Sequence, residues 1–250
     1  STPKPSSAAS DVYKRQVRTA VHRTGVWSTT LVDSVATSNA STLVDCAIAV
    51  TANERPRVLF ADGGDLKMGR YAFASASYWD GPRWHVRTIM EDAHPTHLEL
   101  DTTPEGLEWG LMRTASGALH QVNFSGAYWT EYLLDAGPVG ENFELAIDED
   151  GVAHVLYSRT ATSDVVLLRV DGHDRDLRIL LRDAALVDAL GMDLDANNIE
   201  QVATATQDVS SFSINLIRSL AGQDTGRVDP APVAALTGEN DAMEGQLVIG

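Results

Sequence analysis

Two short polar segments combine carboxylates with groups that would suit a ligand. Asp62 and Asp65 flank two glycines, and a later segment reads Tyr78, Trp79 and Asp80 before another glycine. Aromatic faces pack against sugar rings, while carboxylates accept hydrogen bonds from sugar hydroxyls. We therefore predict that these five residues bind ligand, and calcium is a second ligand type for the first turn because it prefers carboxylate oxygens. The competing interpretations are a plain hairpin turn and turn packing.

Histidines beside acids offer a second kind of chemistry. His94 and His97 lie three residues apart, with Glu91 and Asp92 close by, and this combination of side chains would suit zinc. Pro95 excludes a regular helix through the pair, so the two rings are not fixed on one face. We assign no metal site here and keep His94 as a candidate ligand-binding residue.

His154 stands in an apolar strand-like segment. Its counterparts in the repeats described below are Arg57, Trp109 and approximately Gln201. A symmetric metal site would need like residues at these positions. We therefore predict that His154 is a packed, hydrogen-bonded strand residue.

Composition excludes several classes of function. The formal net charge of −16 disfavours binding to nucleic acids and to anionic membrane surfaces. Apolar runs are far shorter than the ~18 residues of a membrane span. No Gly-rich phosphate loop, G-x-S-x-G elbow or H-E-x-x-H motif occurs. The single cysteine, Cys46, lies in an apolar run and is predicted to be buried and unreactive.

A repeat of four short strands must position all of these residues. The clearest unit covers 141–183 and contains the segments FELAID, VAHVLYS, VVLLRV and LRILLR, separated by Asp, Gly and Ser turns. Turns at such short intervals are typical of antiparallel meanders. Similar units surround it, at a period of roughly 50 residues.

Two side-chain types recur within the units. Trp27, Trp84 and Trp129 open the fourth strand after a Gly-x(1–2) signature, and Leu177 takes that place in the next unit. We interpret this position as packing between neighbouring units. The acids that end the first strand, which we expect to accept bonds from backbone N–H groups of their own turns, are Asp101, Asp148 and Asp195.

These features predict an all-β chain, a β-propeller of four-stranded antiparallel blades. The expected blades cover approximately 45–90, 96–136, 142–183 and 190–236, with a split fifth blade from 17–33 and 244–250. A fragment of a larger propeller fits equally well, because single blades must stack to bury their faces.

The third unit resembles a known group of repeats. Its D-x-D-G-x-x-H-V-x-Y core begins at Asp148 and ends at Tyr157, and it is similar to uncharacterised extracellular β-propeller repeats of bacteria and archaea. The resemblance implies a propeller fold and export from the cell. A distant likeness to sialidase-type propellers lacks an intact S-x-D-x-G-x-x-W box and an arginine triad, which puts sialidase activity in doubt.

The first sixteen residues do not follow the repeat. Residues 6–16, SSAASDVYKRQ, look like the translation of a sequencing adapter. We therefore expect 1–16 to be a non-native, disordered tail on a metagenomic fragment, and we exclude it from fold reasoning.

Loops that join strand two to strand three, and one blade to the next, should emerge on one face. This adds Arg159 and Asp164 to the candidates, so the predicted ligand-binding set is Asp62, Asp65, Tyr78, Trp79, Asp80, His94, Arg159 and Asp164. We assign no catalytic residues, and no cofactor beyond calcium.

The divergent repeats share no polar constellation, which favours a non-catalytic extracellular or cell-surface module that binds a glycan or a protein. The alternative is a glycan-active hydrolase or lyase with acidic residues at the mouth of the propeller channel. Neither hypothesis includes nucleic-acid binding or membrane insertion.

Overall fold

The computed structural model describes residues 14–23, 26–36, 45–72, 83–124, 128–182, 186–208, 211–218 and 231–236. Within these ranges the chain forms strands and turns, and no helix is present. No described segment is a helix of the length and apolar character that a membrane span requires.

The strands form one hairpin and four sheets. The N-terminal hairpin pairs β1 (Lys14–Arg23) with β2 (Val26–Ala36). Sheet 1 contains β3 (Cys46–Val50), β4 (Pro56–Asp62), β5 (Asp65–Ala72) and β6 (Arg83–Met90). Sheet 2 contains β7 (Pro95–Thr102), β8 (Glu108–Thr114), β9 (Leu119–Phe124) and β10 (Trp129–Asp135). Sheet 3 contains β11 (Val139–Ile147), β12 (Ala153–Arg159), β13 (Asp164–Asp171) and β14 (Asp174–Leu181). Sheet 4 contains β15 (Leu186–Leu194), β16 (Glu200–Asp208), β17 (Ser211–Arg218) and β18 (Ala231–Leu236).

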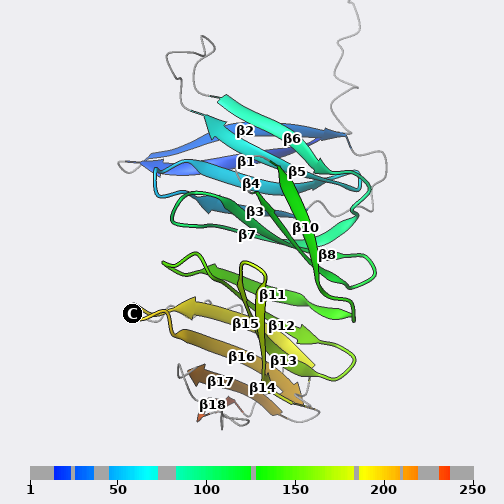
Figure 1. Ribbon diagram of the computed structural model, residues 1–250, viewed down its shortest axis with the longest axis vertical. Coiled ribbons are helices and arrows are strands. Elements are labelled where there is room, and N and C mark those ends of the chain that lie inside the picture. Colours follow the sequence, from blue (N-terminus) through cyan, green and yellow to red (C-terminus); the bar gives the residue numbers. More distant parts are fainter. Residues whose placement is uncertain are drawn as a thin grey trace, which may run out of the picture.

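Each sheet is an antiparallel meander, in which neighbouring strands follow the order of the chain. The sheets stack face to face, and their first strands, β3, β7, β11 and β15, lie next to one another. Figure 1 shows the N-terminal hairpin at one end of the long axis and β17 and β18 at the other. The described sheets therefore form an open arc around their first strands.

Stacking covers both faces of the inner sheets, which explains their uninterrupted apolar strands. In β12, Ala153, Val155 and Tyr157 face sheet 2, whereas Leu156 between them faces sheet 4. Side chains alternate along a strand, so a strand buried on both faces is apolar over most of its length. Truncating one such leucine to alanine costs about 2–5 kcal/mol.

Four apolar cores hold the arc together, one at each interface. Between the hairpin and sheet 1 lie Val17, Val32, Val58 and Phe60, with Trp84 and Val86 beside them. Between sheets 1 and 2 lie Leu59, Leu66, Met68, Leu98, Leu100, Met112 and Val122, with Trp129 beside them. Between sheets 2 and 3 lie Trp109, Leu111, Leu119, Val139, Phe143, Val155 and Tyr157. Between sheets 3 and 4 lie Leu156, Val165, Leu167, Leu180, Leu190, Val202 and Ile217.

The predicted packing role of the repeated tryptophan holds for two of its three members. Trp84 packs against the core beneath the hairpin, and Trp129 packs against the core between sheets 1 and 2. In both cases the ring faces the sheet that precedes its own. Trp27 is 68% exposed, because the structure describes no sheet before the hairpin, and Leu177 is 44% exposed. The prediction was therefore wrong for Leu177, whereas for Trp27 the expected neighbouring unit lies outside the described residues.

Close packing of the hairpin explains one glycine. A Cβ atom at Gly69 would lie 2.9 Å from Val32 Cγ1 and 3.4 Å from the Trp84 ring. Any side chain at this position would push the hairpin away from sheet 1, so glycine is required for the close approach.

One five-residue turn joins the first and second strands in all four sheets. Its first side chain accepts a hydrogen bond from the N–H four residues later: Thr51 from Arg55, Thr103 from Leu107, Asp148 from Val152 and Asp195 from Ile199. Its fourth residue has a positive φ: Glu54, Gly106, Gly151 and Asn198. This turn sets the register of the repeat.

The predicted capping role is confirmed for Asp148 and Asp195. Asp101 accepts a bond from the adjacent Thr102 N at 2.7 Å, as expected for its segment, but it does not cap the turn. Thr103 occupies the capping position of that turn, which starts two residues later than expected. The second oxygen of Asp101 accepts a hydrogen bond from Ile147 N of the neighbouring first strand, at 3.0 Å. Cys46, predicted to be buried, is exposed because the first strands border the open inner side of the arc.

The expected disordered tail is too long. β1 begins at Lys14, and the backbone of residues 14–16 pairs with residues 34–36. Strand pairing uses backbone N–H and C=O groups, which every residue except proline supplies in full. Residues 14–16 can therefore extend the hairpin even though they resemble an adapter sequence. The other expected piece of a fifth blade, 244–250, lies outside the described residues, as do residues 1–13.

Candidate functional site

The two ends of each sheet carry different connections between strands. We call one the link end; it carries the turn between the second and third strands and the link to the next sheet. We call the other the turn end; it carries the five-residue turns and the connections between third and fourth strands. All of the predicted ligand-binding residues except 78–80 were placed at the link end.

The structure brings three of these predicted residues together at the link end of sheet 1. The backbone N–H of His94 donates to Gly64 O at 2.7 Å, and that of Asp92 donates to Asp65 Oδ1 at 3.1 Å. Asp62 forms an ion pair with Lys67. These bonds fasten the turn between β4 and β5 to the link that follows β6, so the predicted sharing of one face by the two kinds of loop is seen here.

Arg159 and Asp164 lie farther along the arc, on sheet 3. Arg159 Nε and the Tyr157 hydroxyl both donate to Asp135 Oδ2, at 2.7 and 3.0 Å. Burial raises the pKa of Asp135, but hydrogen bonds from Gly137 N–H, Arg159 and Tyr157 outweigh it and lower the pKa below its ordinary value. Asp164 is buried and accepts a bond from Thr162 Oγ1 at 2.9 Å.

The link end thus holds two separated groups whose polar atoms are largely paired within the protein. Tyr78, Trp79 and Asp80 lie outside the described residues. Within the ranges that the structure describes, no group of three or more His, Cys, Asp or Glu side chains is arranged to hold a metal ion.

The turn end between sheets 1 and 2 carries a charged group that sequence analysis missed. Arg57 of β4 and Arg70 of β5 are register partners, and both face Glu108, the first residue of β8. Arg57 Nε donates to Glu108 Oε1 at 2.7 Å, and Arg70 Nη2 donates to Oε2 at 2.8 Å. The Glu108 side chain is only 3% exposed. We call Arg57, Arg70 and Glu108 the arginine cluster.

Aromatic rings border the arginine cluster. The Arg70 guanidinium lies 4.0 Å from the centre of the Phe124 ring and 5.7 Å from that of Trp129. Both rings come from sheet 2 and are partly exposed, as is the Arg70 side chain at 30%. Donors, an acceptor and aromatic faces therefore meet at one inter-sheet edge.

The same positions form a different group between sheets 3 and 4. His154 and Arg169 are register partners like Arg57 and Arg70, and Glu200 opens β16 as Glu108 opens β8. His154 Nδ1 lies 2.8 Å from Glu200 Oε1, and Nε2 lies 3.1 Å from Asp148 Oδ2. His154 is fully buried, so the prediction of a packed, hydrogen-bonded histidine is confirmed. We call His154, Asp148, Glu200 and Arg169 the histidine cluster.

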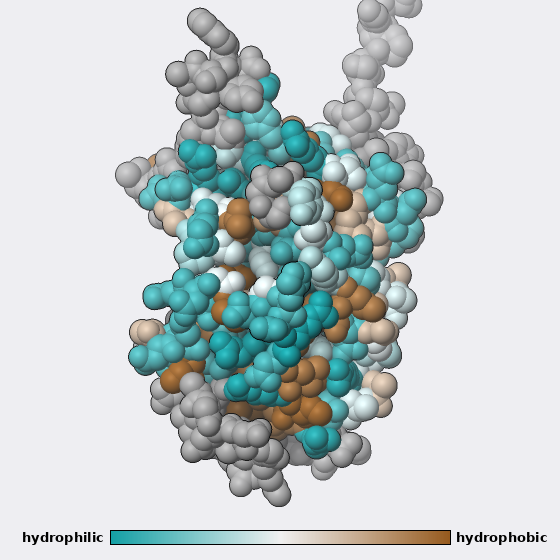
Figure 2. Space-filling view, viewed as in Figure 1, coloured by the Kyte–Doolittle hydropathy of each residue, from teal (hydrophilic) through white to brown (hydrophobic). Residues whose placement is uncertain are grey.

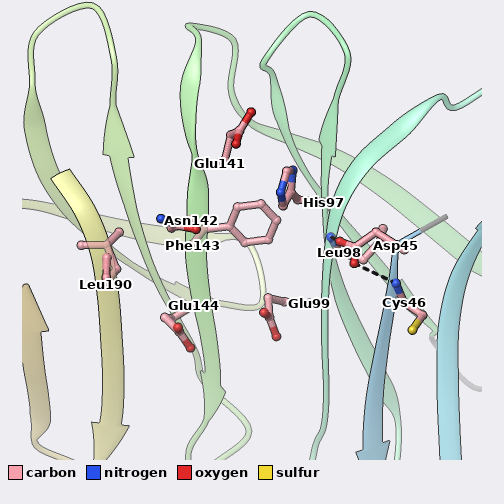
Figure 3. A pocket seen from close by; sticks show the side chains of 11 residues that line it. Asp45, Cys46, His97, Leu98, Glu99, Glu141, Asn142, Phe143, Glu144 and Leu190 are labelled. Atoms are coloured by element: carbon pink, nitrogen blue, oxygen red, sulfur yellow. Dashed lines mark hydrogen bonds between the residues drawn. The ribbon is translucent and has the colours of Figure 1, made fainter. Parts of the chain in front are cut away.

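A groove of about 380 Å³ runs along the first strands, on the inner side of the arc. Figure 3 shows Glu99 of β7 and Glu144 of β11 on neighbouring strands, with Phe143 and His97 nearby. Across the strands, Asp45 Oδ2 accepts a bond from Leu98 N at 2.8 Å. The groove is therefore acidic.

Burial, and for Glu99 also the neighbouring carboxylates, raises the pKa of these acids. Burial first, and then the charges of Glu144, Asp45 and Asp101, raise the pKa of Glu99 to about 7. Burial also raises the pKa of Glu144 and of Asp101 above their ordinary values. A carboxyl that titrates near neutral pH lies in this groove. Cys46 is exposed as a residue, but partial burial of its thiol still raises the pKa, and the charge of Asp45 adds to the effect. A raised thiol pKa argues against a nucleophilic cysteine.

One face of the molecule is mainly polar. Figure 2 shows hydrophilic residues over most of one face, interrupted by separate hydrophobic patches. This agrees with the net charge of −16.

Comparison with known proteins supports the architecture. No family model matches the chain, and no curated protein sequence matches it. Among solved structures, the chain is similar to the SapL1 lectin in complex with alpha methyl fucoside, with a TM-score of 0.55, 12% identity, and coverage of 86% of this chain and 72% of that one.

Two further structures are similar to the chain. The fucose-specific lectin from Aleuria aurantia has a TM-score of 0.51, 12% identity, and coverage of 83% of this chain and 67% of that one. An arginine-to-alanine mutant of AofleA from Arthrobotrys oligospora has a TM-score of 0.52, 10% identity, and coverage of 86% and 64%. Together with the four-stranded sheets, these similarities confirm the predicted all-β propeller fold.

Proposed function

We propose that this chain is a non-catalytic, glycan-binding propeller module that works outside the cell or at its surface. The observation that carries the proposal is the arginine cluster with its two aromatic rings. The fold shared with fucose-binding lectins supports the same conclusion.

The chemistry of the arginine cluster suits a sugar. Guanidinium N–H groups donate to hydroxyl oxygens, and partly exposed aromatic rings pack on the apolar face of a pyranose. Glu108 holds both arginines in place before ligand arrives, which reduces the entropic cost of binding.

Glycan-array screening of the full chain, followed by calorimetric titration of the best ligand, tests the proposal. Replacing Arg70 with glutamine should weaken binding about 10-fold or more, because a charge-assisted donor is lost. The matched control is Arg18→Gln on the hairpin, where the exposed Arg18 contacts only Gln16 among the hydrogen bonds of the described residues. An array without glycan ligands, or equal affinities for R70Q and the parent chain, would overturn the proposal.

A second candidate function, a glycan-active hydrolase or lyase, is favoured by Glu99. General acid catalysis needs a carboxyl that is protonated near neutral pH, and the Glu99 pKa of about 7 meets that need beside a second carboxyl, Glu144. Release of nitrophenol from a panel of nitrophenyl glycosides, abolished by Glu99→Gln, would establish it. Absence of turnover between pH 5 and 8 removes this candidate and leaves glycan binding intact.

A further inference from the structure

The arginine cluster carries more positive charge than it neutralises. Two guanidinium groups share the single carboxylate of Glu108, and no other carboxylate of the described chain lies within ion-pair distance of either arginine. Arginine stays protonated at every pH of interest, so the cluster keeps a net charge of about +1. This excess stands out in a chain whose overall charge is −16.

Glu108 cannot satisfy all of the donors. Arg57 Nε donates to Glu108 Oε1, and Arg57 Nη1 donates to the carbonyl oxygen of Pro56. Arg70 Nε also lies 2.7 Å from Oε1, but it is not aligned for a hydrogen bond and is left without a partner. Arg57 Nη2 and Arg70 Nη1 donate to no residue that the structure describes. The pair therefore retains N–H groups for a further acceptor.

The surroundings strengthen the effect of this charge. Phe124 covers one face of the Arg70 guanidinium at 4.0 Å, and Trp129 lies beyond it at 5.7 Å. Arg57 is only 12% exposed. Apolar neighbours displace water, so the attraction between the excess positive charge and an incoming anion is screened less than at an open surface.

The histidine cluster shows that this charge is not a general property of the repeat. There two buried carboxylates, Asp148 and Glu200, enclose one histidine, while Arg169 Nε lies 3.8 Å from Glu200. Asp148 also accepts backbone N–H bonds from Asp150 and Val152 on its Oδ1. The equivalent positions between sheets 3 and 4 therefore have no comparable excess of positive charge.

We propose that the arginine cluster selects a glycan that bears a carboxylate, that is, a uronic acid or another acidic sugar, over its neutral counterpart. This inference rests on the proposed glycan-binding function and specifies its ligand class. A planar carboxylate takes two parallel N–H bonds from a guanidinium, and the adjoining sugar ring packs on Phe124 or Trp129.

The acidic protein surface restricts the ligand further. A net charge of −16 repels a chain of many anionic sugars but weakens a single short-range ion pair much less. The ligand is therefore one acidic sugar at the end of a glycan, rather than a polyanion.

A matched pair of monosaccharides tests this inference. Methyl β-D-glucuronide and methyl β-D-glucoside differ only at carbon 6, where the first has a carboxylate. Calorimetric titration of the full chain at low ionic strength should show the glucuronide binding about 10-fold more tightly or better, and the preference should shrink with added salt. Equal affinity for the two compounds would overturn the inference.

The outcome separates this inference from the proposal beneath it. If neutral glycans bind and the glucuronide shows no advantage, glycan binding stands and acid selection falls. If no array glycan and neither monosaccharide binds, both fall. A preference that persists in Arg70→Gln and in Arg57→Gln would also overturn the assignment, because the selecting charge would then lie elsewhere. Circular dichroism of each variant checks that the sheets remain folded.

Discussion

The arginine cluster and the histidine cluster occupy the same positions of the repeat. They differ in the ratio of carboxylates to cationic side chains and in burial. In the first, one buried carboxylate serves two arginines that are partly open to solvent. In the second, a fully buried histidine is enclosed by two carboxylates. The comparison shows that equivalent positions of the repeat can carry a partly exposed charged cluster, which we propose binds ligand, or a buried one that joins two sheets.

The position of the His154 ring explains why the histidine cluster works as a brace. Its Nδ1 lies 2.8 Å from Glu200 Oε1 and its Nε2 lies 3.1 Å from Asp148 Oδ2, within hydrogen-bond distance of both carboxylates. The ring therefore joins Asp148 of sheet 3 to Glu200 of sheet 4. Between sheets 2 and 3 the corresponding residue is Trp109, which is buried in an apolar core and makes no such bridge.

The largest effect is expected from removing His154. His154→Ala leaves Asp148 and Glu200 buried without their partner, which should cost about 3–5 kcal/mol of unfolding free energy. At about 2–4 °C per kcal/mol, the thermal midpoint should fall by roughly 10 °C. Differential scanning calorimetry measures this, with His173→Ala in an exposed turn as the control. A thermal midpoint within 2 °C of the parent would correspond to a loss of about 1 kcal/mol or less. That result would contradict the interpretation of His154 as a brace.

A smaller loss is expected at the arginine cluster. Glu108→Gln removes the charge that both arginines share, but these side chains reach solvent, so we expect about 1–3 kcal/mol. Urea unfolding of Glu108→Gln beside Glu105→Gln, an exposed position in the preceding turn, isolates the effect. If Glu108→Gln proves more destabilising than His154→Ala, the contrast between a ligand-facing and a bracing cluster is wrong.

The pH dependence of stability should distinguish Glu99 in the groove from the residues of the two clusters. Folding raises the pKa of Glu99 from 4.5 to about 7, so the fold favours the protonated carboxyl. Its contribution is complete below pH 4.5 and is lost as pH rises toward 7, on the order of 1–2 kcal/mol after solvent screening. Thermal midpoints of the parent and Glu99→Gln should therefore diverge between pH 5 and 8, with the variant more stable at pH 8. Parallel pH profiles would place the titrating group elsewhere.

The smallest effects are expected in the turns that precede the two clusters. Thr103 lies five residues before Glu108, and Asp195 lies five residues before Glu200, and each caps its turn with one hydrogen bond. Thr103→Ala and Asp195→Ala should each cost about 0.5–1.5 kcal/mol by chemical denaturation. A large difference between the two variants would mean that the turns, and not the cluster residues, distinguish the two interfaces.

The fold was accessible from the sequence because its information is local. Short strands, turn residues and a recurring tryptophan lie within single repeats, so counting along the chain was enough to predict four-stranded blades. The same approach failed at Asp101, where the turn begins two residues later, at Thr103. The residue types do not show whether the turn starts at Asp101 or at Thr103, whereas the hydrogen bonds of the turn do.

The arginine cluster was not accessible in the same way. Arg57 and Glu108 are far apart in sequence and meet only because two sheets stack in a particular register. One signal was present: Glu108 and Glu200 each open a second strand, five residues after a capping side chain. Aligning the repeats on their turns, rather than on tryptophan, would have placed both glutamates at one position and drawn attention to their neighbours.

The stacking of locally wound sheets also determines how the chain reaches its folded state. Each meander pairs residues that are close in sequence, and the principal long-range contacts join only adjacent sheets. Loop closure is therefore inexpensive within a sheet, and assembly proceeds by docking one sheet on the next. Amide exchange should be slowest in sheets 2 and 3, which have a four-stranded sheet on both sides, and faster toward the hairpin and β18, where the arc ends.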